Sequence, residues 1–167
     1  MLDVSNVLTE YGPSLGRVVA AYASSSTDRD DLAQDIALAL VRALPRYRGE
    51  SSLRTYVLRI AHNCGVRTIS RRRISLPLDE GEHGVSEPSP EQSVLAQQDA
   101  ERLAQELRRL PLGMRQVVSL TLEGLSQREI AEVLELTENV VSVRLHRARK
   151  HLRDRMPAQE LKHGNRR

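Results

Sequence analysis

The sequence has no phenylalanine, no tryptophan and one cysteine, and aromatic residues make up only 2% of its 167 residues. Its interior must therefore be built from Leu, Val, Ile and Ala, and these residues, with few glycines in the periodic segments, favour an all-α fold. The single cysteine, Cys64, excludes an internal disulfide and is typical of a reducing cytoplasm. No apolar run of about 18 residues is present, so no membrane insertion is expected.

Patterns that carry catalysis or bind a metal are also missing. There is no P-loop, no glycine-rich phosphate cradle and no paired carboxylates spaced for acid–base chemistry. His62 and Cys64 are two residues apart, a spacing that does not put both side chains on one helix face, and there is no second cysteine. We therefore expect no enzyme activity, no metal and no cofactor. We interpret Cys64 as a small buried hydrophobic residue.

Charge is distributed unevenly, although the net charge is only +3 and the pI is near 9.4. Residues 42–73 contain nine arginines and one acidic residue. Residues 76–101 contain seven acidic residues and no lysine or arginine, whereas residues 142–167 contain nine lysines and arginines and two acidic residues. Two basic segments on either side of an acidic one suggest two surfaces that face nucleic acid.

The acidic segment at 75–93 also contains several prolines and glycines, so we interpret it as a flexible linker. It separates one domain at 1–74 from a second at 94–157, which is followed by a basic tail at 158–167. The prediction is thus an all-α protein of two small helical domains. The periodicity predicts helices at residues 3–23, 28–44, 51–72, 91–109, 113–122, 126–134 and 138–154.

Residues 126–153 have the pattern of a helix-turn-helix. Ser126 and Glu129 form an S-x-x-E capping box at the start of a short helix. Residues 135–137 make the turn, and Thr137 is a good N-cap for a second helix. That helix carries an apolar stripe opposite a polar and basic face, an arrangement that places one helix in a DNA groove. A basic surface helix in an ordinary bundle is the alternative. The stripe consists of Val141, Leu145, Ala148 and Leu152.

Other segments carry a more specific signal. DDLAQDIALALVRALPR, residues 30–46, is followed by YRGESSLRTYVLRIAHN, residues 47–63, and LRRLPLGMRQVVSLTLEGLSQREIAEVL occupies residues 107–134. With these segments, the chain resembles the small, two-domain extracytoplasmic-function group of bacterial RNA polymerase sigma factors, with region 2 in the first domain and region 4 in the second.

The resemblance implies a cytoplasmic transcription initiation factor. Such a factor binds the clamp helices and flap of core RNA polymerase, reads the −10 and −35 promoter elements and promotes DNA melting. Its partners would be core polymerase, double- and single-stranded promoter DNA and an anti-sigma factor. A conventional regulator with a C-terminal helix-turn-helix is the rival interpretation, but residues 1–74 show none of the strand–helix alternation of a receiver domain.

The resemblance also assigns residues to polymerase docking. They match the motif that docks on the clamp helices of the largest subunit, and a polar, acidic helix face suits a charged coiled-coil partner. Helix capping and a solvated face are the alternative, since acidic side chains are favoured near a helix N-terminus. The docking residues are Asp31, Leu32, Gln34 and Asp35.

A second set matches the part of region 2 that binds the −10 element. A short loop captures a flipped base, which requires a rigid backbone and a stacking surface. The next helix contacts the melted strand and nearby phosphates. The alternatives are an ordinary turn for the loop and a core position for Tyr56. The residues are Tyr47, Arg48, Gly49, Glu50, Ser51, Arg54, Tyr56, Arg59, Asn63, Arg67, Arg71, Arg72 and Arg73.

A third set matches the part of region 4 that reads the −35 element. Arg147 is the strongest single candidate for a base or phosphate contact. The family usually has a basic residue and a serine where Ser142 and Val143 stand, so Val143 is either surface variation or a contact to a thymine methyl. The residues are Ser126, Gln127, Arg128, Asn139, Ser142, Val143, Arg144, His146, Arg147, Arg149 and Lys150.

Overall fold

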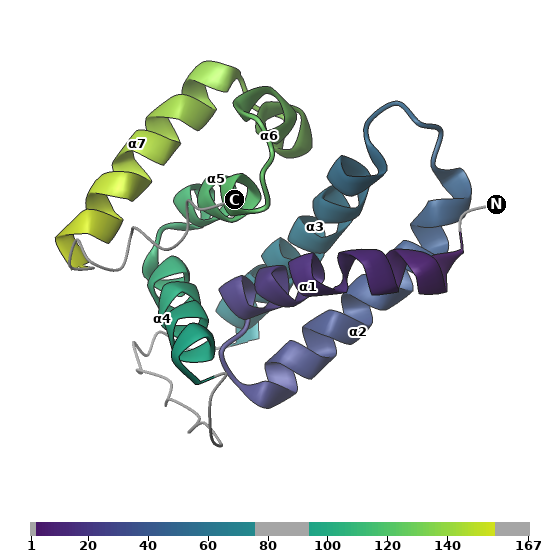
Figure 1. Cartoon of the computed structure of the whole chain (residues 1–167), viewed down its shortest axis with the longest axis horizontal. Helices are drawn as coiled ribbons and strands as arrows, with labels where there is room; N and C mark the ends of the chain where they lie inside the picture. Colours follow the sequence, from purple (N-terminus) through teal and green to yellow (C-terminus); the bar gives the residue numbers. More distant parts are fainter. Residues whose placement is uncertain (1–2, 76–93, 156–167) are drawn as a thin grey trace.

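Every regular element in the described part of the chain is a helix, as predicted for an all-α protein (Figure 1). The structure, a computed structural model, describes the backbone of residues 3–75 and 94–155 and the side chains of residues 3–71 and 97–155. No helix among these residues is long and apolar enough to cross a membrane. The helices are α1 (Val4–Tyr22), α2 (Ser26–Ala43), the 3-10 helix η1 (Leu44–Arg46), α3 (Leu53–Ser75), α4 (Val94–Arg109), α5 (Leu112–Leu122), α6 (Gln127–Leu134) and α7 (Glu138–Arg155).

The helix boundaries differ from the predicted ones where capping side chains decide them. α2 begins before the acidic residues expected to start it, because the Ser25 side chain accepts a hydrogen bond from the Asp28 amide. Of the two serines expected to cap α3, Ser52 does so, since its hydroxyl accepts from the Thr55 amide at 3.0 Å. α2 passes into the 3-10 turn η1, which contains Pro45.

The first half of the molecule is a packed group of α1, α2 and α3. Its core is aliphatic, as the lack of Phe and Trp requires. Cys64 is buried among these residues, as expected for a small hydrophobic side chain. The most deeply buried aliphatic side chains are Val18, Leu32, Ile36, Leu40, Val57 and Leu58.

The second half is built around the predicted helix-turn-helix. α7 packs on α5 and α6, and all four residues of its predicted apolar stripe are buried. Their burial turns the opposite face of α7 outward, because side chains spaced three or four residues apart share one helix face. On α6, Ile130, Ala131 and Val133 are buried as expected.

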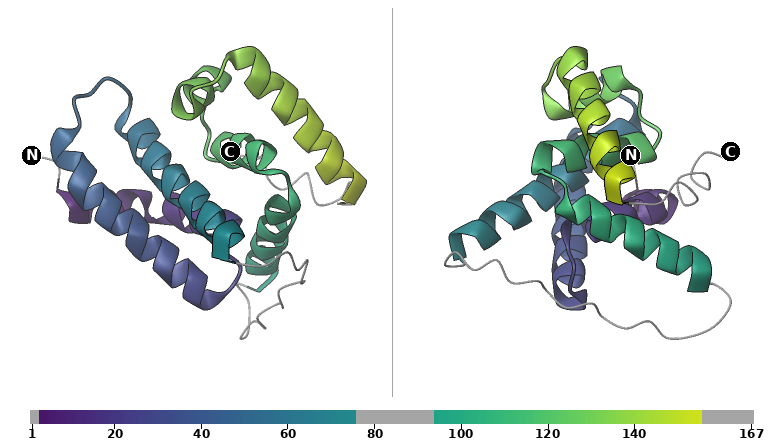
Figure 2. Two further views of the ribbon diagram at one scale, coloured as in Figure 1. Left: turned by 180° about the vertical axis from the view of Figure 1, so that it is seen from behind. Right: turned by 90° about the vertical axis from the view of Figure 1, so that its left-hand side faces the viewer.

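The two halves are not held by the linker alone, because they pack against each other. α1 contacts α4 and α5, and α3 contacts α5 and α6. The buried residues of both halves form one continuous cluster. Figure 2 shows this packing from two further sides, with α7 on the side of the molecule away from α2. Two tethered domains were expected from the sequence, and this contact between them was not. Residues 76–93, most of the predicted linker, lie outside the described residues, as do residues 156–167 with the basic tail.

A buried polar pair joins α1 to α3. The Tyr22 hydroxyl lies 2.9 Å from His62 Nδ1, and the two rings meet edge to face. Burial lowers the pKa of His62 to about 4, although the carboxylate of Glu123 opposes this by raising it. His62 Nε2 is buried and has no hydrogen-bond partner among the described residues. The Arg115 guanidinium lies 5.8 Å from the centre of the Tyr22 ring.

Gly65 lets the Tyr22 ring lie directly against α3. A Cβ added to Gly65 would be 2.6 Å from Cγ of Tyr22 and 2.8 Å from both Cδ atoms, which is closer than carbon atoms tolerate. The ring has no room to retreat, because Tyr22 is 3% exposed and bonded to His62. Glycine is therefore required here by close packing.

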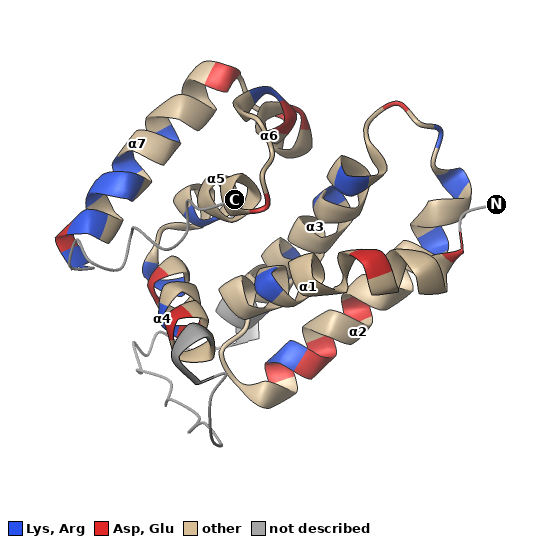
Figure 3. Ribbon diagram, viewed as in Figure 1, with Lys and Arg blue, Asp and Glu red and all other residues tan. Residues whose placement is uncertain are grey.

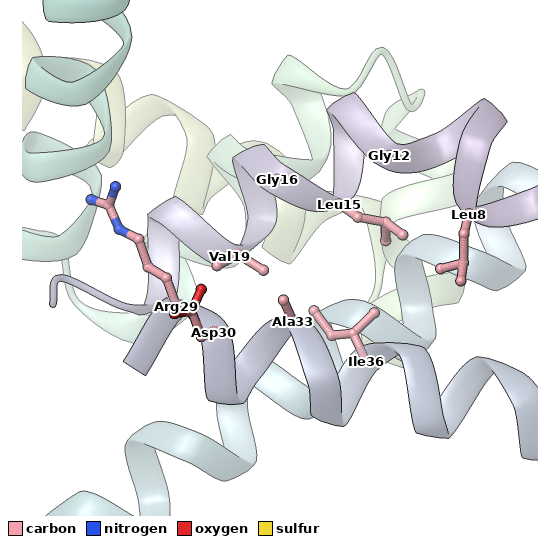
Figure 4. Close-up of a pocket in the computed structure, with 9 residues that line it drawn as sticks. All are labelled: Leu8, Gly12, Leu15, Gly16, Val19, Arg29, Asp30, Ala33 and Ile36. Carbon is pink, nitrogen blue, oxygen red and sulfur yellow. The ribbon is translucent and has the colours of Figure 1, made fainter. Parts of the chain in front are cut away.

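The packing of α1 on α2 leaves an apolar hollow of about 330 Å³. Gly12 and Gly16 line it from α1, and an added Cβ at either position would meet nothing within 4 Å. In Figure 4 the side chains of Leu15, Val19 and Ile36 point into this space. Glycine at these positions thus leaves volume unfilled.

These contrasting surroundings predict opposite effects for one type of substitution. Gly65→Ala is expected to lower the free energy of unfolding by about 1–3 kcal/mol, because the new methyl group overlaps the Tyr22 ring. Gly16→Ala is expected to raise it by about 0.4–1 kcal/mol, because alanine restricts the unfolded chain and fits the helix. Urea denaturation of both variants measures the difference. Equal effects from the two substitutions would contradict the packing argument.

The low pKa of His62 predicts that the protein loses stability in mild acid. Below the ordinary value of 6.5 the unfolded chain takes up a proton that the folded chain, with a pKa of about 4, does not. Stability is therefore complete above about pH 6.5 and falls as the pH drops toward 4, by roughly 2 kcal/mol between pH 7.5 and 5. His62→Gln, less stable at neutral pH, should lose most of this dependence. Denaturation curves at several pH values test it, and an unchanged slope in the variant would rule out His62 as its source.

Candidate nucleic-acid interface

Basic residues gather on α3 and α7, and acidic residues gather on the first part of α2. Figure 3 shows lysine and arginine along α7 and on α3, with aspartate on α2. Within the described residues, the two basic segments counted in the sequence thus lie largely on two separate helices. This distribution gives two basic surfaces, which attract a polyanion, and one acidic surface, which repels it.

The residues predicted to read the −35 element lie on α7 and at the start of α6, where Ser126, Gln127 and Arg128 stand. Ten of the eleven predicted residues are exposed, and they include Arg147 and Val143. Arg144 is the exception: it is half-buried, and its guanidinium packs over Gly113 of α5, where an added Cβ would lie 2.9 Å from Arg144 Nη1. Val140, which the sequence interpretation did not include, is also exposed, at 36%. The sequence could have indicated this exposure, because Val140 directly precedes Val141 of the apolar stripe and neighbouring helix positions point in different directions.

The start of α6 is fixed by the predicted capping box. The Ser126 hydroxyl accepts from the Glu129 amide at 3.3 Å, and the Glu129 carboxylate accepts from the Ser126 amide at 2.8 Å. The hydrogen bonds donated by the Ser126 backbone and side chain hold the pKa of Glu129 below its usual value. The cap therefore fixes the residue at which α6 begins.

The turn between α6 and α7 is tight because Glu135 adopts a left-handed conformation, with φ 55°. The Leu136 amide then reaches back to the carbonyl of Ala131 at 2.9 Å, which closes the end of α6. Thr137 caps α7 as predicted, because its hydroxyl accepts from the Val140 amide at 3.4 Å. Helix, three-residue turn and helix thus match the helix-turn-helix geometry.

The loop before α3 is held by two tyrosines. The Tyr47 hydroxyl donates to the carbonyl of Ser51 at 2.5 Å, and the Tyr56 hydroxyl donates to the carbonyl of Ala43 at 3.1 Å. Their rings lie 5.0 Å apart and both side chains are half-buried, so Tyr56 is neither a fully buried core residue nor freely projecting. Gly49 has φ +77°, a conformation in which glycine is favoured. The exposed tip of the loop consists of Arg48, Gly49 and Glu50.

The remaining predicted −10 residues follow α3. Arg54, Asn63, Arg67 and Arg71 are exposed, whereas Arg59 is half-buried. The side chains of Arg72 and Arg73 lie outside the described residues. Arg59, Arg67 and Arg71 are spaced at multiples of four residues and share one face of α3, the arginine row, whereas Arg54 lies on another side and contacts Glu123 of the second half.

On α2, three of the four predicted docking residues are exposed: Asp31, Gln34 and Asp35. Leu32 requires a correction, since it is 1% exposed and its side chain lies in the core. Sequence position within the motif could not distinguish it from its outward-facing neighbours.

The same exposed surface of α2 includes two residues that the sequence interpretation missed. Leu38 and Val41 are 46% and 49% exposed. The sequence could have indicated that they share a face with Gln34, because Leu38 follows Gln34 by four residues and Val41 follows Leu38 by three. Asp35 also lies 3.4 Å from Arg71, which makes an exposed ion pair between α2 and α3.

A third feature, the interdomain contact, joins α1 and α3 to the segment between α5 and α6. Arg17 Nε and Nη2 donate to the two carboxylate oxygens of Glu123 at 2.7 and 2.8 Å, and Glu123 is buried. Arg54 donates to the backbone carbonyl of Glu123, and Thr55 Oγ1 lies 3.5 Å from Glu129 Oε1. Nothing in the sequence pairs Arg17 with a residue so far along the chain.

Further contacts between the halves lie beside α4. Arg29 Nη2 contacts Glu101 at 2.7 Å, and Arg108 Nη1 donates to the carbonyl of Ala20 at 2.6 Å. Hydrogen bonds from Arg29 and Arg108 lower the pKa of Glu101, although its partial burial works in the opposite direction. Charged groups thus surround the apolar part of the contact between the halves.

Two known protein families match this chain, one in each half of the molecule. Residues 7–74 match the family described as Sigma-70 region 2, and residues 100–152 match the one described as Sigma-70, region 4. The first span covers α1 to α3. The second covers most of α4 and the helices up to the greater part of α7.

Relatives match over most of the chain. It is 34% identical to RNA polymerase sigma factor CnrH of Cupriavidus metallidurans over 87% of this chain and 82% of that protein. It is also 34% identical to RNA polymerase sigma factor YlaC of Bacillus subtilis, over 75% of this chain and 76% of that protein. These alignments span both halves.

Solved structures share the fold. CnrH in complex with the cytosolic domain of CnrY has a TM-score of 0.65 at 26% identity, over 98% of this chain and 89% of that one. The sigma factor RpoE in complex with the anti-sigma factor NepR, from Bartonella quintana, has a TM-score of 0.70 at 19% identity, which shows the fold alone. With regions 2 and 4 in order and relatives that span both, this chain belongs to the extracytoplasmic-function group of the sigma-70 family and is a promoter-specific transcription initiation factor.

Proposed function

We propose that each of the three exposed surfaces binds a different target. The face of α2 with Asp31, Gln34 and Asp35 docks on core RNA polymerase. The loop before α3 and the arginine row of α3 bind the −10 element, and the outward face of α7 binds the −35 element. In this proposal residues 1–74 and 94–157 are the two functional domains, joined by the segment 75–93, and the protein acts in the cytoplasm.

The observation that carries the proposal is the orientation of α7. Its apolar stripe is buried on α5 and α6, so its basic and polar residues face outward in a helix-turn-helix. A helix so presented fits the major groove, where side chains distinguish the four base pairs. The arginines of α3 support the second DNA contact, because phosphate contacts position a protein on its site.

An anti-sigma factor is a further proposed partner. Support comes from the relative CnrH, whose solved structure contains the cytosolic domain of CnrY. The exposed apolar residues Leu38 and Val41 on the docking face of α2 provide a surface that either polymerase or such a partner would cover.

This assignment of the three surfaces predicts that the purified chain forms a complex with core RNA polymerase. The complex should initiate run-off transcription from specific genomic fragments, whereas core enzyme alone should not. Gel filtration detects the complex and mapped transcript ends identify the promoters. A conventional regulator would bind DNA without joining the core enzyme, so DNA binding without co-elution would favour that rival.

Arg147→Ala is predicted to weaken binding of the holoenzyme to its promoter by about 1–3 kcal/mol, because a base or phosphate contact is lost. Arg109→Ala is the matched control: Arg109 is also an exposed arginine in the second half, but it pairs with Glu106 within α4. Titrations at fixed salt compare the two variants. Unchanged binding of the Arg147 variant would remove this residue from the interface.

A further inference from the structure

Two valines of α7 lie at the surface of the molecule, where packing in the core does not explain them. The side chains of Val140 and Val143 are 36% and 41% exposed, whereas that of Val141 between them is fully buried. Valine loses side-chain freedom in a helix, so it forms helices less readily than alanine or lysine. Burial accounts for the choice of valine at position 141. At positions 140 and 143 an exposed valine adds nothing to the stability of the helix, so binding to another molecule is the better explanation.

Val143 points away from the rest of the protein. A helix turns by about 100° per residue, so Val143 lies about 160° around α7 from both Val141 and Leu145 of the buried stripe. Val140 precedes Val143 by three residues and lies at the edge of the same outward surface. Both valines belong to the first two turns of α7, which begins at Glu138. In a helix-turn-helix, residues near the start of the second helix contact base edges.

The positive charge of α7 lies further along the helix. Its exposed arginines and lysines begin at Arg147, and Figure 3 shows them in the part of α7 that lies away from α6. Arg144, the arginine nearest to the valines, is half-buried and packs over Gly113 of α5. The exposed side chains of the first two turns therefore include no lysine or arginine. They are those of Glu138, Asn139, Val140, Ser142 and Val143.

The major groove offers an apolar side chain one distinctive partner. Of the groups by which base pairs are distinguished there, only the C5-methyl group of thymine is apolar, and the others are hydrogen-bond donors and acceptors. A valine placed against a donor or acceptor removes it from water and provides no hydrogen bond in return, which is unfavourable. A valine that faces base edges therefore selects thymine.

The spacing of the two valines suits two adjacent bases. Three residues of α-helix rise by about 4.5 Å, and successive bases of one DNA strand are about 3.4 Å apart along the duplex axis. These two distances are similar, so a helix in the groove brings the two side chains to neighbouring base pairs and not to distant ones.

We infer that Val143 and Val140 read the C5-methyl groups of two neighbouring thymines in the −35 element, with Val143 making the closer contact. The inference rests on the proposed role of α7 and adds a base preference to it. Arg147, one turn beyond Val143, contacts the next part of the site, and the basic residues that follow it bind phosphates. The −35 elements that this chain recognises accordingly contain two adjacent thymines on one strand.

The first test removes single methyl groups from the DNA. In a promoter mapped by run-off transcription, each thymine of the −35 element is replaced in turn by deoxyuridine, which lacks only the C5-methyl group. Wild-type holoenzyme is expected to bind about fourfold more weakly when either of two neighbouring methyl groups is missing, because the contact buries one methyl-sized group. Equal binding of all the substituted duplexes, or −35 elements without adjacent thymines, would overturn the inference.

The second test removes the valine side chains. Val143→Ala is expected to bind the natural promoter about fourfold more weakly and to bind thymine and deoxyuridine equally at one of the two positions. Val140→Ala is expected to lose the preference at the other position. Alanine favours the helix, so a loss of affinity does not come from unfolding of α7. If both variants keep the full preference for thymine at both positions, the valines do not read the methyl groups.

Val41→Ala is the matched control, because Val41 is also a valine in a helix and is 49% exposed, but it belongs to α2. This variant is expected to keep the fourfold preference for thymine. Each preference is a ratio of two dissociation constants measured with one holoenzyme at fixed salt, so a change in assembly with polymerase cancels. Loss of the preference in the Val41 variant would contradict its assignment to α7.

The same measurements separate this inference from the proposed function. If Arg147→Ala and both α7 valine variants bind every duplex as wild type does, α7 does not read the −35 element, and the proposed role and the inference both fail. If Arg147→Ala weakens binding while the loss of methyl groups has no effect, the proposed role of α7 stands and thymine recognition by the valines is rejected.

Discussion

The burial of one carboxylate, Glu123, between the two halves is the constraint on which the arrangement of this molecule depends. Its two oxygens accept hydrogen bonds from Arg17, and its carbonyl accepts one from Arg54, so both α1 and α3 are joined to the second half at one point. A charge is tolerated in such a place only when it is paired. The relative position of the halves is therefore set by these polar contacts together with the apolar cluster that is continuous across the contact.

Within each half, by contrast, apolar packing sets the geometry. α7 is oriented by four buried aliphatic residues, and its basic face points outward as a consequence. In the first half, the Tyr22 ring packs directly against Gly65, and its hydroxyl lies beside His62 Nδ1. The halves are thus stable units of aliphatic packing, whereas the contact between them includes many charged groups.

The sequence predicted local structure well because local signals were strong. The capping box at Ser126, the cap at Thr137 and the apolar stripe of α7 all lie where the pattern placed them. The sequence was less reliable about where α2 begins, because Ser25 caps this helix and the acidic residues that follow it do not. It also assigned Leu32 to a docking surface, because a family motif does not record which of its residues face the core.

By itself, then, the sequence determined the helical class, the two halves, the helix-turn-helix and the family. These depend on hydrophobic periodicity, capping residues and short motifs, all of which act over a few neighbouring positions. Only the tertiary structure decided that Arg17 meets Glu123, that Tyr22 lies on Gly65, and that Arg144 packs over Gly113 while Arg147 stays exposed. These facts depend on how helices distant in sequence pack together, and no periodic pattern encodes which side chains then come into contact.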